Sequence, residues 1–555
     1  MARNINWWFW VGVCCILANP KDSKSQEVTA RETESVMLRA ARYMVEQVST
    51  HGGYVDRYLP DFSRRWGELE AFETQITIRH GGNATCGMGH TFLNAYQATG
   101  DEYYYQAAEK VARALIWGQL ESGGWDYIID FAGHRSLQTW YNTIGRNAWG
   151  WFEYHHYYGT ATHKQVTTEA GRFLLRFYLE KMDPTYRSAV DNVINFMLES
   201  QYPLGGWPQR YPFTHSYQYE GKPDYTPFYT FSNVGVIWEN IEFLIMCYRA
   251  LGDARLVEPI MRGMNFYLIT QQAPPQAGWA ATYDLELKPT YARPFEPAAL
   301  STMQTYYHIL LLMRFYQYTG DVKFLAGIPD AIAWIESTKL TKGKESSGDA
   351  SRYPTFVELG TNKPLYSHRT GTGVLDGKYW VDYSEEDMYA FGVNIELDME
   401  RLKVLFKQLK GISVEEATVH SPLKQAMAPP DELDGRLRSY ALNKSYYDGI
   451  TDFVPDFQER RFSYLNRKPS SLEAKSVVDA LDEHGRWLST GAWVSDPYTV
   501  SDTGVPSNTA LHCDPSSATA VLDTSGQKYL STQVFVSNMQ VLCAYLLQHK
   551  LELKP

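Results

Sequence analysis

A turn-rich segment at residues 201–212 combines residue types that suit a grip on an acidic sugar. It reads Gln-Tyr-Pro-Leu-Gly-Gly-Trp-Pro-Gln-Arg-Tyr-Pro, and its glycines and prolines permit tight turns and fix φ. We therefore expect a rigid loop with Trp207, Arg210 and Tyr211 pointing outward, so that an aromatic surface lies beside a cation. The alternative is a tight turn between two helices, in which the tryptophan packs on the next helix.

A second segment supplies a candidate carboxylate clamp. Trp279, Tyr283 and Asp284 are followed by Arg293 and Glu296 in the stretch Tyr-Ala-Arg-Pro-Phe-Glu-Pro. The planar guanidinium of Arg293 offers paired donors that match a carboxylate, and the first three residues are candidate substrate contacts. The alternative is a structural ion pair between Arg293 and one of the two carboxylates.

Composition narrows the class of ligand. The chain has 555 residues, of which 14% are aromatic, with 40 Tyr and 16 Trp. Aromatic faces are common in carbohydrate-binding grooves, although large helical cores are also rich in them. The net charge of −11 argues against a nucleic-acid partner. If the substrate is a polyanion, its site must be a local positive patch.

The N-terminus predicts export. Residues 1–18 carry one basic residue and then an apolar run of signal-peptide length, so a membrane contact is expected only through a lipid anchor there. No other segment is long and apolar enough to span a membrane. The four cysteines beyond this leader are scattered and are more typical of buried small residues than of a disulfide framework: Cys86, Cys247, Cys513 and Cys543.

Self-similarity predicts the fold. Three blocks run from a Gly-Asp or Met-Asp-Pro turn to a Gly-Trp loop, and Trp125, Trp207 and Trp279 follow the aspartate of their block by 24, 24 and 26 positions. Each block follows an apolar helical segment. Helical hairpins cannot bury their apolar faces alone and must stack, so we expect a mainly α fold, a closed αα-toroid with the Gly-Trp loops at one end.

The expected organisation is a leader at 1–18, a toroid domain at 30–340 and an extension at 341–555 that packs on the toroid. In the extension, turns between short apolar runs predict strands within 356–383, and 412–433 is expected to be a loop. Helices are predicted at 35–48, 91–98, 171–179, 186–198, 236–250, 305–318, 322–337, 396–410, 477–487 and 532–549. The last is expected to close the ring against the N-terminal helix.

The two candidate segments resemble the pectic-acid lyase family, the family 10 polysaccharide lyases. Its members resemble this chain in the pattern Gln-Tyr-Pro-x-Gly-Gly-Trp-Pro-Gln-x-Tyr-Pro, matched at 201–212. They also resemble it in Trp…Tyr-Asp…Pro…Ala-Arg-x-aromatic-Glu-Pro, matched at 279–297. The resemblance covers about residues 90–340 and identifies the chain as a divergent member.

The resemblance implies cleavage of uronate polymers by β-elimination. That reaction needs the uronate carboxylate neutralised, a base for the C5 proton, and a proton or hydrogen bond for the O4 leaving group. The family places the base on Arg293. Since the pKa of arginine lies above about 12, Arg293 can act as a base only in a desolvated site crowded with other cations. The alternative role for Arg293 is a carboxylate clamp.

The resemblance also implies calcium, held by acidic and amide residues near the starts of two inner helices. The chain departs from the family at both. Residues 163–169 read His-Lys-Gln-Val-Thr-Thr-Glu where the family has Asp-Asn-Gly-Ala-Thr-Thr-Thr, and 231–234 read Phe-Ser-Asn-Val where it has Phe-Asn-Asp-Asn. Both acidic positions are replaced, by His163 and Asn233. Calcium prefers several oxygen ligands, so a calcium-dependent mechanism is only one alternative.

The replacements favour neutralisation of the carboxylate by protein groups. His163, Lys164 and Asn233 are candidates for that role, and a histidine or a tyrosine such as Tyr229 is the candidate base or acid. The alternative for His163 is a surface loop near a helix N-terminus. These departures favour a uronate-rich polymer other than plain polygalacturonate, such as the sulfated polymer ulvan.

We therefore expect a secreted or surface-exposed polysaccharide lyase. Three alternatives stay open. One is a calcium-dependent pectate lyase. Another is a toroidal glycoside hydrolase, for which Asp284 and Glu296 are the nearby carboxylate pair. The third is a glycan-binding protein without catalysis.

Overall fold

The computed structural model describes residues 28–78, 84–145, 158–214, 222–231, 235–340, 351–370, 378–389, 392–424, 467–495 and 520–552. The predicted leader, Asn233 and Cys513 lie outside these ranges, as does the side chain of Lys164.

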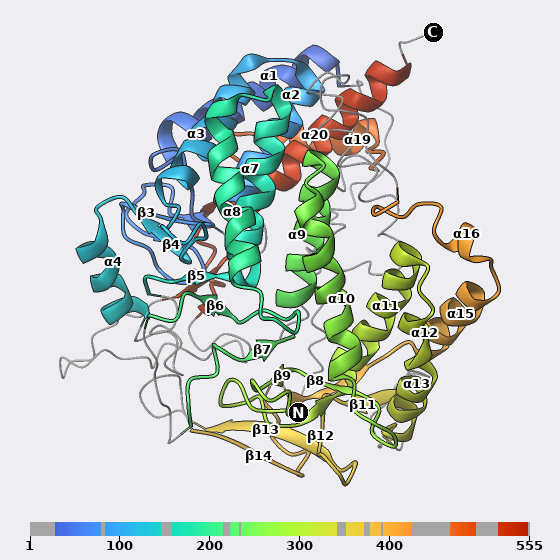
Figure 1. Ribbon diagram of the computed structural model, residues 1–555. Coiled ribbons are helices and arrows are strands. Elements are labelled where there is room, and N and C mark those ends of the chain that lie inside the picture. The colour runs from blue at the N-terminus through green and yellow to red at the C-terminus, as the bar shows by residue number, and fades with distance from the viewer. Residues whose placement is uncertain are drawn as a thin grey trace, which may run out of the picture.

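The described chain is mainly helical and is built from stacked antiparallel helix pairs (Figure 1). In the first three pairs, the first helix is buried on nearly all sides and the second on one face, which makes them inner and outer helices. The pairs are α2 (Thr85–Thr99) with α3 (Glu102–Trp117), α7 (Thr168–Lys181) with α8 (Arg187–Glu199), α9 (Val236–Leu251) with α10 (Val257–Thr270), and α11 (Thr302–Thr319) with α12 (Lys323–Ala326) and α13 (Ile328–Ser337).

The two ends of the described chain meet in this stack. Helix α20 (Thr532–Glu552) packs against α1 (Ala30–Tyr43) and α2, and α19 (Ser471–Asp479) packs on α1 and α20. Inner helices α2, α7 and α9 contact one another in turn. The αα-hairpin toroid class expected from the repeats is therefore confirmed, and so is the contact of the last helix with the N-terminal helix.

The hairpins share one turn chemistry. Gly100, Gly252 and Gly320 end their inner helices in the left-handed conformation. An aspartate then caps the next helix, as Asp101 does by accepting a hydrogen bond from the Tyr103 amide at 2.9 Å. The Gly-Asp signal of the sequence is thus a C-cap followed directly by an N-cap.

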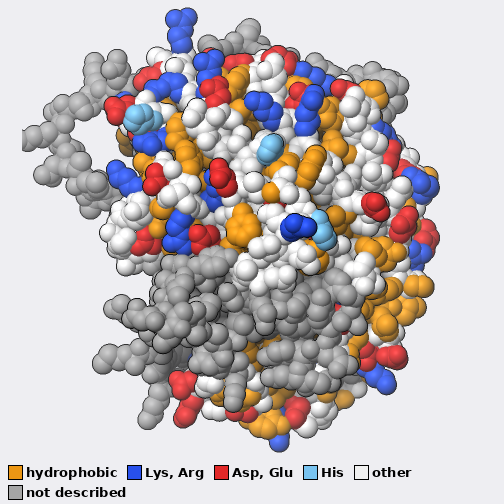
Figure 2. All heavy atoms as spheres, turned by 90° about the vertical axis from the view of Figure 1, so that its left-hand side faces the viewer, with side chains coloured by type: hydrophobic (Ala, Val, Ile, Leu, Met, Phe, Trp, Pro, Cys, Tyr) orange, Lys and Arg blue, Asp and Glu red, His pale blue; other side chains and the backbone are white. Residues whose placement is uncertain are grey.

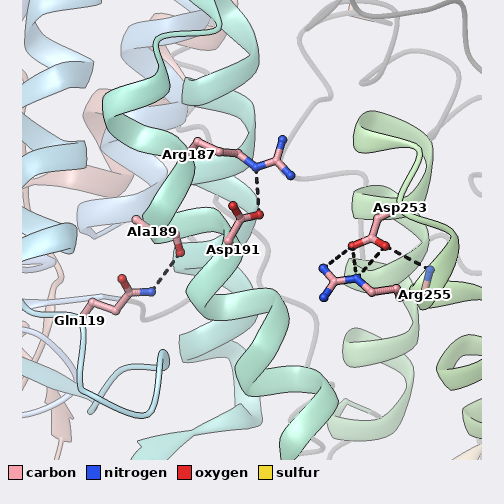
Figure 3. A network of polar contacts seen from close by, with 6 residues as sticks. All are labelled: Gln119, Arg187, Ala189, Asp191, Asp253 and Arg255. Carbon is pink, nitrogen blue, oxygen red and sulfur yellow. Dashed lines mark hydrogen bonds and ion pairs between the residues drawn. The ribbon is translucent and has the colours of Figure 1, made fainter.

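A glutamine joins each hairpin to the next. The Gln119 side-chain amide donates to the Gly123 carbonyl at 2.8 Å and to the Ala189 carbonyl of α8 at 3.1 Å. Figure 3 shows this joint beside two surface ion pairs, Arg187–Asp191 and Arg255–Asp253. Gln201 and Gln271 repeat the arrangement in the following two hairpins, so these joints fix the spacing of the stack.

Short strands gather at the end of the stack that carries the Gly-Trp loops (Figure 1). Antiparallel pairs join the loop after an outer helix to the segment before an inner helix: β3 (Gln75–Thr77) with β4 (Ile128–Asp130), β5 (Ala161–Thr162) with β6 (Arg210–Tyr211), and β7 (Tyr229–Thr230) with β9 (Thr282–Tyr283). We call this end, defined by these three pairs, the ribbon end.

Two larger sheets complete the ribbon end. One has the strand order β14 (Lys378–Asp382), β13 (Pro364–Thr370), β12 (Phe356–Val357), β10 (Leu300–Ser301) and β8 (Trp279–Ala280). The other has the order β16 (Leu488–Ser489), β19 (Tyr529–Ser531), β1 (Arg57–Tyr58) and β2 (Arg65–Trp66). Two further pairs are β11 (Arg352–Pro354) with β15 (Asn394–Glu396), and β17 (Trp493–Ser495) with β18 (Ala520–Leu522). Strands predicted within 356–383 are confirmed.

The other helices correct some expectations. They are α4 (His134–Trp140), α15 (Met399–Lys410) and α16 (Val414–Ala417), of which α16 lies in the expected loop 412–433. The helix predicted at 477–487 is wrong, because α19 ends at Asp479. Asp482 then accepts the amides of His484 and Arg486 and folds the chain into a turn.

Cys86, Cys247 and Cys543 are buried free thiols, as the scattered spacing predicted. Within the described ranges, no helix combines the length and apolar character that a membrane crossing requires.

Candidate functional site

The ribbon end brings most of the candidate residues together. Arg210 and Tyr211 form β6, Tyr229 begins β7, Trp279 begins β8 and Tyr283 ends β9, while His163 follows β5 directly. The expectation that these distant segments share one end of the stack is confirmed. The individual side chains, however, differ in their exposure and in their hydrogen-bond partners, and these decide whether each can contact a substrate.

Trp207 and Trp279 close hairpins and do not point outward. Both are fully buried. The Trp207 indole donates to the Met197 carbonyl of α8 at 2.9 Å, and the Trp279 indole donates to the Tyr267 carbonyl of α10 at 2.8 Å. Each tryptophan thus binds an orphan carbonyl near the end of its own outer helix. The expectation that Trp207 points outward is therefore wrong, and burial disfavours the predicted substrate contact of both tryptophans.

Trp125 and Trp487 repeat this closure. The Trp125 indole donates to the Leu115 carbonyl at 2.8 Å, and the Trp487 indole donates to the Val477 carbonyl at 3.0 Å. The Gly-Trp signal therefore marks the end of a hairpin, and the chain contains a fourth copy, Gly485-Arg486-Trp487, that the sequence reading missed.

Arg210 is engaged in a buried ion pair. It is fully buried, its Nη2 lies 2.8 Å from Asp224, and its Nε donates to the Thr226 hydroxyl at 2.7 Å. Asp224 also accepts the Thr226 amide at 2.8 Å. The charge of Arg210 is thus used inside the protein, and the expectation that it points outward to a sugar is wrong. Tyr211 is half-buried and stays a candidate contact.

Arg293 lies in a tight turn with Glu296. The Arg293 Nη1 is 3.3 Å from Glu296 Oε2, and the same carboxylate accepts the Arg293 amide at 3.1 Å. The Glu296 amide donates back to the Arg293 carbonyl at 2.8 Å. Only 8% of the arginine side chain is exposed. Of the open alternatives, the structure shows the ion pair with Glu296.

Asp284 and Tyr283 have structural roles. Asp284 accepts the amides of Glu286 at 3.0 Å and Lys288 at 2.8 Å, which holds a surface turn. Tyr283 is fully buried, its hydroxyl donates to the Thr270 carbonyl at 2.8 Å, and burial raises its pKa. This burial disfavours the predicted contact of Tyr283 with substrate.

Tyr229 is poorly placed to act as a base. It is 4% exposed, and its ring packs on Tyr202 and Phe266, with centroids 4.9 and 4.7 Å away. Burial raises its pKa, which disfavours the tyrosinate that a base would need. The prediction of Tyr229 as a catalytic residue does not fit this environment.

His163 is in the core, so the surface-loop alternative is wrong. Its ring packs on Phe196 at 4.7 Å, and its Nδ1 lies 3.0 Å from the Asn240 side-chain amide. Burial lowers its pKa to about 3, against a smaller upward effect of the Asn240 hydrogen bond. The imidazole is neutral at ordinary pH and cannot neutralise a uronate carboxylate. A complete lack of exposure also argues against its predicted catalytic role.

Buried charges also lie between the inner helices. Arg172 of α7 pairs with Glu242 of α9, and lies 3.7 Å from Glu169. Arg176 donates to Asn94 of α2 at 2.6 Å and lies 3.2 Å from His90 Nδ1. Charges on otherwise apolar helical faces were the available signal. These contacts tie α2, α7 and α9 together away from solvent.

The described residues do not fit the calcium that the family implies. Within them, no group of three or more histidine, cysteine, aspartate or glutamate side chains could hold a metal ion. His163, which the resemblance places at an acidic ligand position of the family, is a buried neutral imidazole held by Asn240. No step of a mechanism is therefore assigned to a metal.

The described chain is thus a mainly helical αα-toroid with short strand pairs at its ribbon end. The family model described as pectic acid lyase matches residues 145–391. The resemblance read from the two motifs is therefore confirmed for this part of the chain, which is similar to that family. The match begins and ends later than the range of 90–340 expected from the motifs.

Solved structures to which this chain is similar include two forms of one lyase and a mannanase. A family 10 polysaccharide lyase from Cellvibrio cellulosa is 18% identical, covers 67% of this chain and 99% of its own, and has a TM-score of 0.35. A mutant of that lyase in complex with trigalacturonic acid is 18% identical, covers 64% and 98%, and also has a TM-score of 0.35. A GH76 α-mannanase from Bacteroides thetaiotaomicron is 9% identical, covers 95% and 98%, and has a TM-score of 0.38. No curated protein matches the sequence.

Proposed function

We propose that this protein is a polysaccharide lyase that cleaves a uronate-containing acidic polysaccharide by β-elimination. The observation that carries the proposal is the Arg293–Glu296 turn, which presents a guanidinium at the ribbon end within the segment that matches the pectic acid lyase family. The same proposal includes export of the protein, as expected from the leader. It also includes a preference for ulvan or a similar sulfated polymer as substrate.

Arg293 acts in this proposal as a carboxylate clamp. A guanidinium has five N–H donors in a planar fork, so it can serve Glu296 and a uronate carboxylate together. Its pairing with Glu296 places a carboxylate beside the guanidinium, whereas an arginine base needs surrounding cations. The positive charge of the clamp stabilises the negative charge that develops when the C5 proton leaves.

The bonds of the reaction balance within the substrate. The C5–H electron pair forms the C4–C5 double bond as the C4–O4 bond breaks. The base keeps the C5 proton, and the O4 leaving group receives a proton from a general acid or from water. Tyr211 is the half-buried tyrosine of β6 that remains a candidate for hydrogen bonding there.

The hydrolase alternative is less well supported. It needs one carboxyl group to protonate the leaving group and a second to act as base or nucleophile. Asp284 holds a turn through two backbone amides, and Glu296 is paired with Arg293. Both nominated carboxylates thus already have structural partners.

The test is ultraviolet absorbance of the new C4–C5 double bond. Polygalacturonate and ulvan are incubated with the enzyme side by side, each with and without a chelator. We expect chelator-insensitive absorbance on ulvan. A chelator-sensitive signal on polygalacturonate would instead establish the calcium-dependent pectate mechanism, and new reducing ends without absorbance would establish a hydrolase. No product from either polymer contradicts the stated substrate preference.

A matched variant tests the clamp. Arg293→Lys keeps the charge but loses the planar fork, and we expect kcat/KM to fall about 100-fold, the range seen when one oxyanion donor is removed. Arg255→Lys changes an exposed arginine paired with Asp253 and should leave kcat/KM unchanged. Equal activity of the Arg293 variant and the native enzyme would rule out the clamp.

A further inference from the structure

Two arginines of the ribbon end are already paired with carboxylates. Arg210 is paired with Asp224, and Arg293 is paired with Glu296. Each pair sums to zero charge, so neither alone gives the site the net positive charge that a polyanion requires. The surface seen in Figure 2 shows basic and acidic side chains interspersed over its described part. The described part of this face therefore has no broad basic patch.

Lys222 is an exception beside the Arg293 turn. Its side chain is exposed, and its ammonium lies 5.1 Å from the centroid of the Tyr291 ring, over its face. Phe228 packs edge-on against the same ring, with centroids 6.2 Å apart. A cation over an aromatic face is attracted by the ring quadrupole, which gives the lysine a preferred position.

Tyr291 connects this lysine to the proposed clamp. The Tyr291 hydroxyl donates to the Pro223 carbonyl at 3.0 Å, which ties the segment after Lys222 to the segment that leads into Arg293. Tyr291 precedes Arg293 by two residues in the chain. The lysine and the arginine are therefore held on connected backbone segments.

The charge of Lys222 is not cancelled within the described chain. Asp224, the acidic residue two positions away, is engaged by Arg210 and by the amide and hydroxyl of Thr226. No ion pair joins Lys222 to any acidic residue in the described ranges. Within the described ranges, Lys222 therefore adds a positive charge close to the two paired arginines.

We propose that Lys222, held over Tyr291, binds an anionic group of the acidic polysaccharide. The anionic group is a carboxylate or a sulfate, since both present charged oxygens to an ammonium. This inference rests on the proposed function, because it concerns the same substrate. It assigns substrate recognition to a residue that the motifs did not identify.

The experiment measures polymer binding without turnover. Native protein, Lys222→Met, Lys222→Arg and Lys288→Met are compared by affinity electrophoresis in gels that contain polygalacturonate or ulvan, at low and high salt. Lys288 is also exposed and lies in the turn held by Asp284, so its variant is matched in net charge. Both methionine variants keep a long unbranched side chain, and neither lysine is buried.

We expect Lys222→Met to weaken binding about fivefold at low salt, the scale of about 1 kcal/mol for one exposed ionic contact. Lys222→Arg should retain binding, and Lys288→Met should match the native protein. The difference should shrink at high salt because exposed charges are screened. Carboxyl-reduced and desulfated polymers identify the group, since the variant's defect should disappear with the polymer that lacks it.

Two outcomes would overturn the inference. Unchanged binding by Lys222→Met removes the lysine from recognition, and equal losses for Lys222→Met and Lys288→Met show a diffuse charge effect instead of a site. Failure of the proposed function looks different. A protein that binds polymer through Lys222 but yields no unsaturated product supports the site and rejects the lyase.

Discussion

The buried Arg210–Asp224 pair allows a direct test of whether Arg210 serves the fold or the substrate. The two charges lie 2.8 Å apart, with 1% and 4% of their side chains exposed. At an effective dielectric of about 20, Coulomb's law gives about 6 kcal/mol of attraction, which desolvation of both groups offsets. Removal of one partner strands the other charge in the core. We therefore expect Arg210→Met or Asp224→Asn to lower the free energy of unfolding by about 3–5 kcal/mol.

The double variant separates the loss of the ion pair from the cost of a stranded charge. Arg210→Met combined with Asp224→Asn leaves no stranded charge, so its cost should be smaller than the sum of the two single costs by at least about 1 kcal/mol. Urea unfolding followed by tryptophan fluorescence measures all three, because Trp207 is fully buried. Polymer binding by the folded variants should be unchanged. Native stability of Arg210→Met together with weaker polymer binding would refute the structural role.

Three further predictions concern the frame of the site. Trp487→Phe removes the indole donor to the Val477 carbonyl, and urea unfolding should show a loss of about 1–3 kcal/mol. Gly205→Ala should lower the free energy of unfolding by more than about 2 kcal/mol, because φ is +108° and a Cβ would lie 2.1 Å from a carbonyl oxygen of α10. Gly133→Ala should lower it by less, because that residue also has a positive φ, +90°, but a Cβ there would meet no atom within 4 Å. The pKa of His163 is lowered from 6.5 to about 3, so its contribution to stability is complete above pH 6.5 and is lost as pH falls toward 3. The melting temperature of the native protein should therefore fall over this pH range, and His163→Asn should make that fall smaller.

The repeats made the helical frame predictable, because local signals determine it. Gly100 and Asp101 mark a C-cap and an N-cap that depend on adjacent residues only. The apolar helices between such turns were therefore placed within a few residues. The helix predicted at 477–487 is wrong because the apolar spacing continues past Asp482. The side chain of Asp482 accepts two backbone amides and folds the chain into a turn. Gly485, which has a positive φ in this turn, was the local signal for it.

The site was less predictable because its side chains depend on partners distant in the chain. Nothing local to Arg210 identifies Asp224 as its partner, and the burial of His163 results from Phe196 and Asn240 on other segments. The outward orientation assigned to Trp207 overlooked a local clue. The same Gly-Trp pair recurs in each block, and a feature repeated in every hairpin belongs to the hairpin, not to a single substrate site.

The contact of α20 with α1 and α2 has a consequence for synthesis of the chain. Strand β19 pairs with β1, and α20 packs on α2, so residues near 530–550 complete surfaces formed by residues 30–99. While a ribosome makes the intervening 400 or so residues, the apolar side of α2 that α20 later covers has no permanent partner. Contacts this distant in sequence slow folding. We expect the nascent N-terminal hairpins to depend on chaperones until α20 emerges, and release of chains that stop before residue 529 should give aggregated protein.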